Sequence, residues 1–383
     1  MPSPSTSPPE PVAVAAGRVA LVHDWLTGMR GGERVLEALC EIFPAADLYT
    51  LLHVKGSVSP IIEARRPRNS FVRHLPFARR YYRQYLPLFP LAIEQFDFDG
   101  YDLVVSSSHC VAKSIVRTGR TRHLCYCHSP MRYAWDQFDA YFGPARIGRL
   151  ASAAMRPTMA ALARWDAATA GRVDRFLANS QHVAGRIRRY YNRGATVVYP
   201  PVDTEFFRPD GSQVDPYFLV VSALVPYKRL EVAIRACAAL GARLKIVGDG
   251  PERQRLARIA GPETEFLGRR GAEALRTLYQ RATALIQAGE EDFGMAPVET
   301  QACGRPVVAL ARGGALESVE DGVTGILVSE PTPEAFAQGL ARVRSQRFDP
   351  EAIRARALRF SRARFTAGVR EAAGELLSSG HPC

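Results

Sequence analysis

The sequence has no apolar run of the roughly 18–20 residues that a membrane-spanning helix needs, so we expect no transmembrane segment. It also lacks the G-x-G-x-x-G and G-x-x-x-x-G-K-[ST] patterns, so nicotinamide dehydrogenase and P-loop functions are only weakly supported. Its seven cysteines are an odd number scattered through apolar segments, which favours a reduced cytosolic protein over a disulfide framework.

The composition is that of a folded chain. Its 383 residues are 47% hydrophobic and 23% charged, which excludes a disordered or fibrous protein and gives room for two domains. The first 16 residues are rich in proline and serine and lack the basic start of a secretion signal. We therefore expect residues 1–16 to be a disordered tail.

The net charge of +12 is unevenly distributed. Residues 1–200 hold 26 Lys and Arg against 15 Asp and Glu, whereas residues 201–383 hold 24 against 23. This asymmetry suggests an anionic partner for the first half, and nucleic acid, anionic lipid and phosphorylated substrates remain open. Only four of the 50 basic residues are lysine, so an arginine-rich proteome is an alternative explanation of the arginine count but not of the asymmetry.

Short, continuously apolar segments alternate with helix-like segments, which indicates parallel β-α-β units and sheets buried on both faces. A polar, proline-bearing stretch at 200–216 separates two such series, so we predict two doubly wound α/β domains, at residues 17–200 and 201–349. A long helical pattern at Glu351–Leu377 is expected to cap the second domain or to cross back to the first. The predicted strands are Val19–His23, Leu103–Ser106, Leu124–Cys127, Phe176–Ala178, Thr196–Tyr199, Tyr217–Ala223, Leu244–Val247, Ala284–Gln287, Val307–Ala309 and Ile326–Val328.

The turn after the first predicted strand carries the pair Gly31-Gly32, ahead of a helix that starts near Glu33. In doubly wound sheets, ligands bind beyond the carboxyl ends of the strands. Glycines let the backbone approach a ligand, and the first N–H groups of a helix attract anions. A plain turn is the alternative for this pair.

His128 follows the third predicted strand directly, and Pro130 restricts the chain two residues later. Its imidazole should project at the carboxyl edge of the sheet as a base, an acid or a hydrogen-bond donor. A structural histidine in a packed loop is the alternative. We expect no zinc site at Cys125 and Cys127, because no second Cys or His pair stands at ligand spacing.

The most specific pattern contains Glu291 and Glu299, which are separated by seven residues and bracket a turn at Gly294. A helix that begins after this turn points its first amides, near Met295 and Ala296, at a bound anion. The two carboxylates can then accept hydrogen bonds from sugar hydroxyls on either side of a diphosphate. A chance acidic helix face is the alternative.

With these residues the chain resembles the family-4 retaining glycosyltransferases of the GT-B fold, in which two Rossmann-like domains face a cleft. The resemblance covers about residues 17–378, and the Glu291/Glu299 element is its strongest mark. The segment Cys127–Asp136 is most similar to bacterial mannosyltransferases that build O-antigen or exopolysaccharide repeats on lipid carriers. The other supporting motifs are Asn179-Ser180, Val225–Arg229, Val247–Pro251 and Gly313–Glu317.

The resemblance implies that Glu291 contacts the hydroxyls of the donor sugar, that Glu299 binds the ribose of its nucleotide and that Lys228 pairs with the diphosphate. It places His128 beside the transferred sugar and the pair Gly31-Gly32 in the cleft between donor and acceptor. The helical tail at 350–378 is expected to cross back onto the first domain. The expected catalytic residues are His128, Glu291 and Lys228, and the further donor-binding residues are Arg229, Phe293, Gly294, Met295, Ala296, Glu299 and Gly248.

The chain departs from the family at Ala223. Family members commonly carry an arginine five residues before the lysine as a second diphosphate contact, and Arg229 is the candidate substitute here. The resemblance implies that the acceptor attacks the face from which the diphosphate leaves, so that Glu291 positions the sugar rather than attacking it. Lys228 and the helix N-terminus after Gly294 can stabilise the leaving diphosphate, so we expect neither a metal nor another cofactor.

Residues 61–90 hold seven arginines against a single acidic residue, Glu63, with aromatic residues between them. Such a patch suits a membrane interface rich in anionic lipid, or a polyprenyl-diphosphate acceptor. We expect no nucleic acid partner, because no RNA-binding motif accompanies the patch. A solvated arginine face is the alternative. The arginines are Arg65, Arg66, Arg68, Arg73, Arg79, Arg80 and Arg83.

The sequence thus predicts an enzyme of bacterial polysaccharide biosynthesis that moves a hexose, in the first place mannose from GDP-mannose, onto a lipid-linked or glycan acceptor. We expect it to be cytoplasmic and bound peripherally to the cytoplasmic face of the membrane. The alternatives are a UDP-sugar donor, a nucleotide-sugar epimerase of the same fold, and a non-catalytic nucleotide-sugar-binding component of a polysaccharide-assembly complex.

Overall fold

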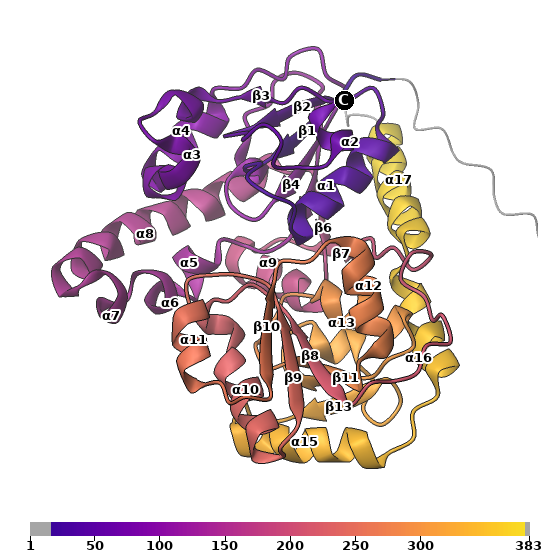
Figure 1. Ribbon diagram of the computed structural model, residues 1–383. Coiled ribbons are helices and arrows are strands. Elements are labelled where there is room, and N and C mark those ends of the chain that lie inside the picture. Colours follow the sequence, from indigo (N-terminus) through magenta and orange to yellow (C-terminus); the bar gives the residue numbers. More distant parts are fainter. Residues whose placement is uncertain (1–16, 380–383) are drawn as a thin grey trace, which may run out of the picture.

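The computed structural model describes residues 17–379 and contains two entirely parallel β-sheets, which lie one above the other in Figure 1. The expected disordered tail, residues 1–16, lies outside the described residues. The first sheet has the strand order β3-β2-β1-β4-β5-β6-β7 and the second has the order β10-β9-β8-β11-β12-β13. Helices cover both faces of each sheet, so the predicted pair of doubly wound α/β sheets is confirmed. The boundaries at residues 200 and 349 stay a prediction.

The strands of the first sheet are β1 (Val19–His23), β2 (Asp47–Thr50), β3 (Arg68–Asn69), β4 (Leu103–Ser108), β5 (Arg122–Cys127), β6 (Arg175–Ala178) and β7 (Ala195–Val197). The strands of the second are β8 (Tyr217–Val221), β9 (Arg243–Val247), β10 (Thr264–Gly268), β11 (Ala284–Gln287), β12 (Val307–Leu310) and β13 (Gly325–Val328). The sequence analysis missed β2, β3 and β10. These three lie at or next to an outer edge of a sheet, where polar residues interrupt the apolar run.

Helices that accompany the first sheet are α1 (Gly31–Ile42), α2 (Pro60–Glu63), η1 (Phe71–His74), α3 (Ala78–Tyr81), η2 (Tyr82–Leu88), α4 (Phe89–Glu94), η3 (Ala112–Ser114), α5 (Arg132–Trp135), α6 (Phe138–Phe142), α7 (Pro144–Ile147), α8 (Arg149–Thr169), η4 (Ala170–Arg172) and α9 (Gln181–Tyr191). Those that follow are η5 (Pro226–Lys228), α10 (Leu230–Ala239), α11 (Arg253–Ile259), α12 (Ala272–Arg281), α13 (Met295–Ala302), α14 (Ala315–Ser318), α15 (Pro333–Ser345), α16 (Pro350–Ala357), η6 (Leu358–Phe360) and α17 (Arg362–Ser378).

The central strands are buried along nearly their whole length, as the continuous apolar runs predicted. All six residues of β4 are buried, although the strand ends in three serines at Ser106–Ser108. Strands covered by helices on both faces need apolar side chains on both faces. The serines stand at the carboxyl edge, where the hydroxyl of Ser107 meets His128 on the turn that follows β5.

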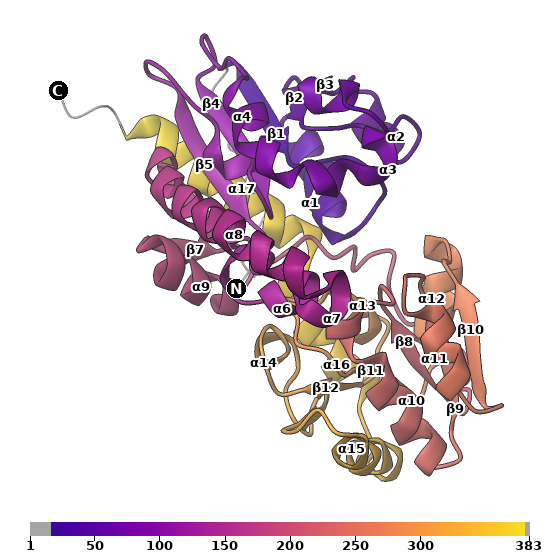
Figure 2. The same cartoon turned by 90° about the vertical axis from the view of Figure 1, so that its left-hand side faces the viewer.

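The single long helix predicted at 351–377 is wrong. The chain forms α16, a 3₁₀ turn over Leu358–Phe360 and then α17, whose N-cap Ser361 accepts a hydrogen bond from the N–H of Arg364. Helix α16 packs on α13 of the second domain, whereas α17 packs on α1 and β5 of the first (Figure 2). The break redirects the chain, so the expected crossing back to the first domain is confirmed.

The two passages of the chain between the domains lie side by side. Val202 pairs with Ser361 in a parallel bridge, in which the N–H of Val202 donates to the carbonyl of Phe360 and the N–H of Arg362 donates to that of Val202, each at 3.1 Å. The outgoing and returning segments are therefore hydrogen-bonded to each other where they cross.

Candidate active site

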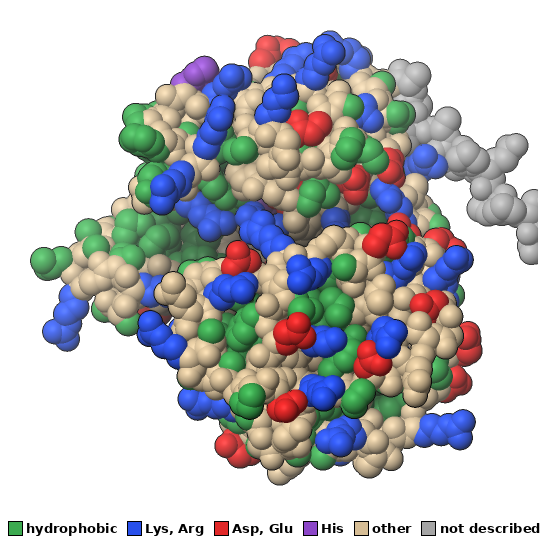
Figure 3. Space-filling model, viewed as in Figure 1, with side chains coloured by type: hydrophobic (Ala, Val, Ile, Leu, Met, Phe, Trp, Pro, Cys, Tyr) green, Lys and Arg blue, Asp and Glu red, His purple; other side chains and the backbone are tan. Residues whose placement is uncertain are grey.

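The carboxyl ends of the two sheets face one another across the domain boundary, because α1 follows β1 and α13 follows β11 at the same boundary (Figure 1). In Figure 3, Lys and Arg side chains gather along this boundary. The predicted site residues of both domains lie on the turns at these two edges. Glycines on both sides allow the turns to approach closely.

Glu291 lies on the loop between β11 and α13, held against a glycine loop that follows β12. It forms a bridge with Gly313, and its carbonyl accepts a hydrogen bond from the N–H of Gly314 at 2.9 Å. A Cβ atom on Gly313 would stand 2.3 Å from the carbonyl oxygen of Glu291, so a side chain there would displace the loop. Gly313 and Gly314 thus fix the backbone of Glu291.

Lys228 ends the 3₁₀ turn after β8, and its ammonium group pairs with the carboxylate of Glu291. Both side chains are mostly buried. Burial, with the nearby Arg132 guanidinium as a smaller cause, lowers the pKa of Lys228 to about 7, and Asp292 opposes this. The sequence analysis predicted both residues, and the structure brings them together. A bound diphosphate would add the negative charge that favours the ammonium form.

Helix α13 begins at Met295, after Gly294 in a left-handed conformation with φ of 87°. A Cβ atom at Gly294 would lie 2.7 Å from the Oε1 atom of Gln287, so both conformation and space favour glycine here. The first amides of α13 therefore open toward the domain boundary, where the Sδ atom of Met295 approaches Gly31. The helix thus begins where the sequence predicted it, and the binding of an anion at its N-terminus stays a prediction.

Glu299 is almost completely buried on α13, and both of its carboxylate oxygens have partners. Oε2 accepts a hydrogen bond from the hydroxyl of Tyr279 at 2.8 Å, and Oε1 pairs with the guanidinium of Arg34 from the first domain. The sequence analysis did not name Arg34. The signal available was its position two residues after Gly32, on the helix that starts at the predicted cleft.

The first domain contributes His128 and the glycine pair. The Nε2 atom of His128 lies 2.8 Å from the Oγ atom of Ser107, its backbone N–H donates to the carbonyl of Ser108, and its carbonyl accepts from the amide of Asn179. A Cβ atom on Gly32 would stand 3.7 Å from the same Nε2 atom. Burial lowers the pKa of His128 to about 3, so the imidazole is neutral at physiological pH.

A buried ion pair joins the two edges. The Nε and Nη2 atoms of Arg132 lie 2.9 and 2.5 Å from Oδ2 of Asp292, the residue after Glu291. Arg132 and Lys228 both approach the ring of Tyr227, at 5.9 and 5.2 Å from its centroid. Arg132 lies within the predicted segment Cys127–Asp136, but no pattern in the sequence pairs it with a residue of the other domain.

Other predicted residues lie close by but differ in what their side chains do. Phe293 is buried against Tyr199 and Phe360, so only its backbone is available at the cleft. A Cβ atom on Gly248 would stand 1.8 Å from the carbonyl oxygen of Ser222, so this glycine permits close strand packing. Arg229 is exposed and has a φ of 51° at the start of α10.

The arginine patch divides into structural and exposed members. Arg65 donates to the carbonyls of Cys40 and Pro44, and Arg68 contacts Tyr49 and Asp47 at the sheet edge. The exposed members are Arg66, Arg68, Arg73, Arg79, Arg80 and Arg83. The last three accompany Phe77, which is 79% exposed, over α3 and η2. Figure 3 shows basic and apolar side chains side by side on this part of the surface.

Within residues 17–379, no group of three or more His, Cys, Asp or Glu side chains is arranged to hold a metal ion. One Asp-x-Asp triplet, Asp97-Phe98-Asp99, has metal-motif spacing. It precedes β4 at the amino edge of the sheet, away from the cleft, and Asp97 accepts the backbone N–H of Asp99 at 2.8 Å. Metal independence stays a prediction.

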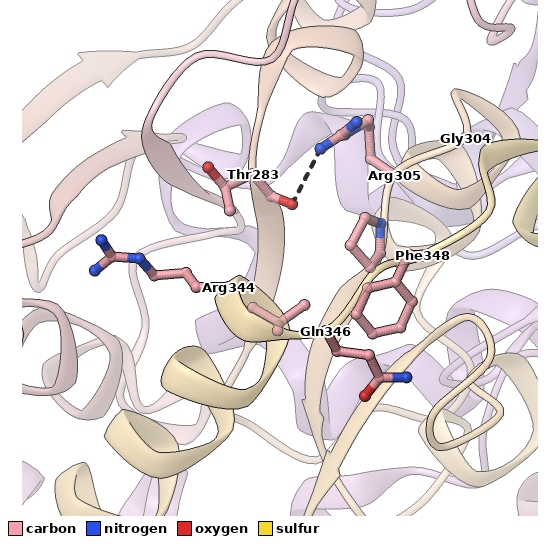
Figure 4. Close-up of a pocket in the computed structure, with 8 residues that line it drawn as sticks. Thr283, Gly304, Arg305, Arg344, Gln346 and Phe348 are labelled. Carbon is pink, nitrogen blue, oxygen red and sulfur yellow. Dashed lines mark hydrogen bonds between the residues drawn. The ribbon is translucent and has the colours of Figure 1, made fainter.

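A cavity of about 330 Å³ lies at the opposite, amino edge of the second sheet (Figure 4). Arg305 in its wall donates to the carbonyls of Ala282 and Thr283, so its charge serves the packing of the strand ends.

Within the described residues, none of the helices combines the length and apolar character that crossing a bilayer requires.

Two family models match adjoining parts of the chain. "Glycosyltransferase Family 4" matches residues 29–206 and "Glycosyl transferases group 1" matches residues 202–360. Among curated proteins, the D-inositol 3-phosphate glycosyltransferase of Saccharomonospora viridis is 34% identical over 203 residues, which are 44% of this chain and 47% of the relative. The chain thus spans less than half the length of this relative.

Solved structures share the whole architecture. Anabaena HepE in complex with UDP-glucose superimposes with a TM-score of 0.67 at 18% identity, covering 94% of this chain and all of HepE. The lipopolysaccharide outer core galactosyltransferase WaaB has a TM-score of 0.63 at 16% identity, covering 93% of this chain and 98% of WaaB. At these identities the likeness shows the fold, and it confirms the predicted GT-B arrangement.

Proposed function

We propose that the chain is a glycosyltransferase of the kinds described by the two family models, which match residues 29–206 and 202–360. It transfers a hexose from a nucleotide sugar to an acceptor hydroxyl with retention of the anomeric configuration. The observation that carries this proposal is the contact of Lys228 with Glu291 beside the N-terminus of α13, opposite His128 and Gly32. The ammonium group of Lys228 and the first amides of α13 suit the diphosphate of a nucleotide sugar. The carboxylate of Glu291 suits its hydroxyl groups.

The chemistry follows from these groups. Breaking the bond between the anomeric carbon and the diphosphate leaves negative charge on the phosphate oxygens. Lys228 and the first amides of α13 stabilise this charge, while Glu291 holds the sugar hydroxyls and Glu299 holds the ribose. Neither carboxylate is needed as a nucleophile, and no metal enters the step.

The donor we favour is GDP-mannose, on the resemblance of the segment from Cys127 to Asp136 to mannosyltransferases. The alternative is a UDP-sugar, supported by the UDP-glucose complex of the structural neighbour HepE. A thermal-shift screen of GDP-, UDP- and ADP-sugars separates them, because a ligand that binds the folded state raises the melting temperature by mass action. A shift by UDP-sugars alone would overturn the GDP-mannose assignment.

Acceptor dependence tests the reaction class. A transferase releases nucleoside diphosphate when an acceptor is present, an epimerase converts the donor without releasing it, and a non-catalytic binding component does neither. We expect release with polyprenyl-diphosphate-linked glycan, and conversion of the donor sugar without release would refute the transferase proposal.

The exposed basic and aromatic surface over α3 and η2 supports a lipid-linked acceptor at an anionic membrane surface. We expect the protein to sediment with anionic vesicles at low salt and to remain in the supernatant at high salt. Replacing Arg79, Arg80 and Arg83 by serine should abolish sedimentation. Replacing Arg243, Arg269 and Arg270, exposed on the second domain, is the matched control. Equal sedimentation of both variants would remove the assignment.

A further inference from the structure

A hydroxyl group lies between two imidazoles at the first-domain side of the cleft. The Oγ atom of Ser107 is 3.1 Å from Nδ1 of His23 and 2.8 Å from Nε2 of His128. His23 and Ser107 are paired residues on the adjacent strands β1 and β4, and both are fully buried. His128 alone is partly open to solvent, on the turn after β5.

Both imidazoles are neutral at physiological pH. Burial and, to a smaller extent, the neighbouring His109 lower the pKa of His23 to about 3, and the same two causes lower the pKa of His128 to about 3. A neutral imidazole carries one N–H and one bare nitrogen, whereas a serine hydroxyl has one hydrogen to donate. The hydroxyl can therefore donate to only one of its two neighbours.

Two neutral imidazoles allow four combinations of tautomers. In one of them both nitrogens that face Ser107 are bare, so one of the two contacts has no hydrogen and the proton of His23 sits on its unpartnered Nε2. The other three arrangements place a hydrogen in both contacts. If His128 donates from Nε2 and Ser107 donates to His23, the proton of His23 sits on Nε2, which is buried and has no partner. If both imidazoles donate to Ser107, the hydroxyl hydrogen itself has no acceptor. A buried N–H or O–H without an acceptor costs about 1–3 kcal/mol.

In the third arrangement His23 donates from Nδ1 to Ser107, and Ser107 donates to Nε2 of His128. Among the buried ring nitrogens and the hydroxyl of these three side chains, the one left without a partner is then the bare Nε2 of His23. An unpaired acceptor is less unfavourable than an unpaired donor. His128 must then carry its proton on Nδ1. That atom is not among the buried unpartnered atoms of the described residues, which agrees with the partial exposure of His128.

We propose that His23 and Ser107 are positioning residues that hold His128 in the Nδ1–H tautomer, so that His128 presents an N–H donor to the cleft. This excludes the base among the three roles that the sequence left open, because an imidazole with Nδ1 protonated and Nε2 occupied has no free lone pair. On the proposed function, which this role rests on, the acceptor of the N–H is a hydroxyl oxygen of the transferred hexose.

The tautomer can be read directly from the free protein by NMR. Multiple-bond ¹H–¹⁵N correlation of histidine-labelled protein distinguishes protonated from bare ring nitrogens, and the signals of His128 are those lost in His128→Gln. We expect Nδ1 protonated and Nε2 bare in the wild type. The opposite pattern would overturn the proposal, whatever the activity of the enzyme.

Variants test whether Ser107 sets the tautomer. Ser107→Ala should give a mixture of both tautomers and lower kcat/KM about tenfold, whereas Ser107→Thr, which keeps the hydroxyl, should retain the wild-type pattern and rate. Ser106→Ala is the matched control, because Ser106 is equally buried on the same strand and its Oγ lies 2.8 Å from Nε2 of His123.

The outcomes separate this proposal from the proposed function. An Nδ1–H pattern that Ser107→Ala disturbs and Ser106→Ala does not would support the positioning role even if no nucleotide sugar were turned over. An unchanged pattern in Ser107→Ala would refute the role of Ser107 even if hexose transfer were demonstrated.

Discussion

The two edges that face the cleft are built from different kinds of groups. The first-domain side presents neutral histidines, buried hydroxyls and glycine backbone, together with two cations, Arg34 and Arg132, that are paired with carboxylates of the second domain. The second-domain side presents Lys228, Glu291, Asp292 and Glu299. The difference indicates a division of work. On the proposed function, we expect the second domain to hold the charged leaving group and its nucleotide, and the first domain to orient uncharged hydroxyls with hydrogen bonds.

Lowering the pH should destabilise the first domain before it destabilises the second. All histidines among the described residues lie in the first domain, and burial lowers the pKa of four of them, His23, His109, His123 and His128, to about 3. Between the unfolded value near 6.5 and about 3, the unfolded chain binds more protons, so stability falls as pH falls. Each histidine contributes about 1.4 kcal/mol per pH unit in that window.

Hydrogen exchange measured at pH 7 and pH 5 checks this expectation. Amides of β1, β4 and β5 should lose protection at pH 5, while those of β8, β11 and β12 should change much less. Equal loss in both sheets would contradict the contrast between the domains.

Removing the charges of the second edge should have the largest effect on transfer. Lys228→Ala and Glu291→Ala should each lower kcat by about 10²–10³-fold, because groups that stabilise developing charge typically contribute this much. Lys245→Ala, which removes the other lysine of the second domain from its place over Tyr217, is the control and should leave kcat unchanged. Wild-type release of nucleoside diphosphate by either site variant would remove the mechanism.

Glu33, at the start of α1, tests whether the first-domain side of the cleft disfavours charge. Burial raises the pKa of this residue, which accepts the N–H of Arg30 at the start of α1, to about 7. The folded state therefore binds more protons than the unfolded state between pH 4.5 and 7, and stability falls as pH rises through that window. Glu33→Gln should raise the free energy of unfolding by about 2–3 kcal/mol at pH 8.

Denaturant unfolding of wild type and Glu33→Gln at pH 8 and pH 5 measures this effect. The stabilisation should be large at pH 8 and small at pH 5, since the wild-type carboxyl is protonated in the fold at the lower pH. A stabilisation of equal size at both values would show that charge is not its cause.

Glu299 should affect binding more than chemistry. Glu299→Ala is expected to weaken nucleoside diphosphate binding about tenfold, because it removes one charge-assisted hydrogen-bond acceptor for the ribose. Calorimetric titration with the nucleoside diphosphate measures the change. Glu290→Ala is the control, since this carboxylate is about half exposed and its histidine partner is 3.7 Å away. Equal affinities in the two variants would argue against the ribose assignment.

The sequence predicted those parts of the site whose residue types act locally. Gly294 needs a left-handed conformation and Glu299 lies on the helix that follows, so spacing alone placed them on one element. The second chain segment at each contact was not predictable. Arg34 meets Glu299 across 265 positions and Arg132 meets Asp292 across 160, and no local pattern records such pairs.

The misjudged elements of the fold have a similar cause. Strands β3 and β10 are short or polar edge strands, whose residues lack the apolar run that marks a buried strand. The helical tail continued in pattern through Leu358–Phe360, yet Ser361 caps a new helix there. Ser361 is a recognisable helix N-cap, but nothing in the local sequence indicates that the chain turns onto the other domain there.

The two interdomain segments, hydrogen-bonded to each other at Val202 and Ser361, form a single hinge between the domains. Because both backbones cross at one place, one domain can swing against the other but cannot slide or unscrew without breaking their mutual hydrogen bonds. On the proposed function, we therefore expect opening for substrate exchange and closing for reaction to follow one arc, which would return Lys228 and His128 to the same relative position after each turnover.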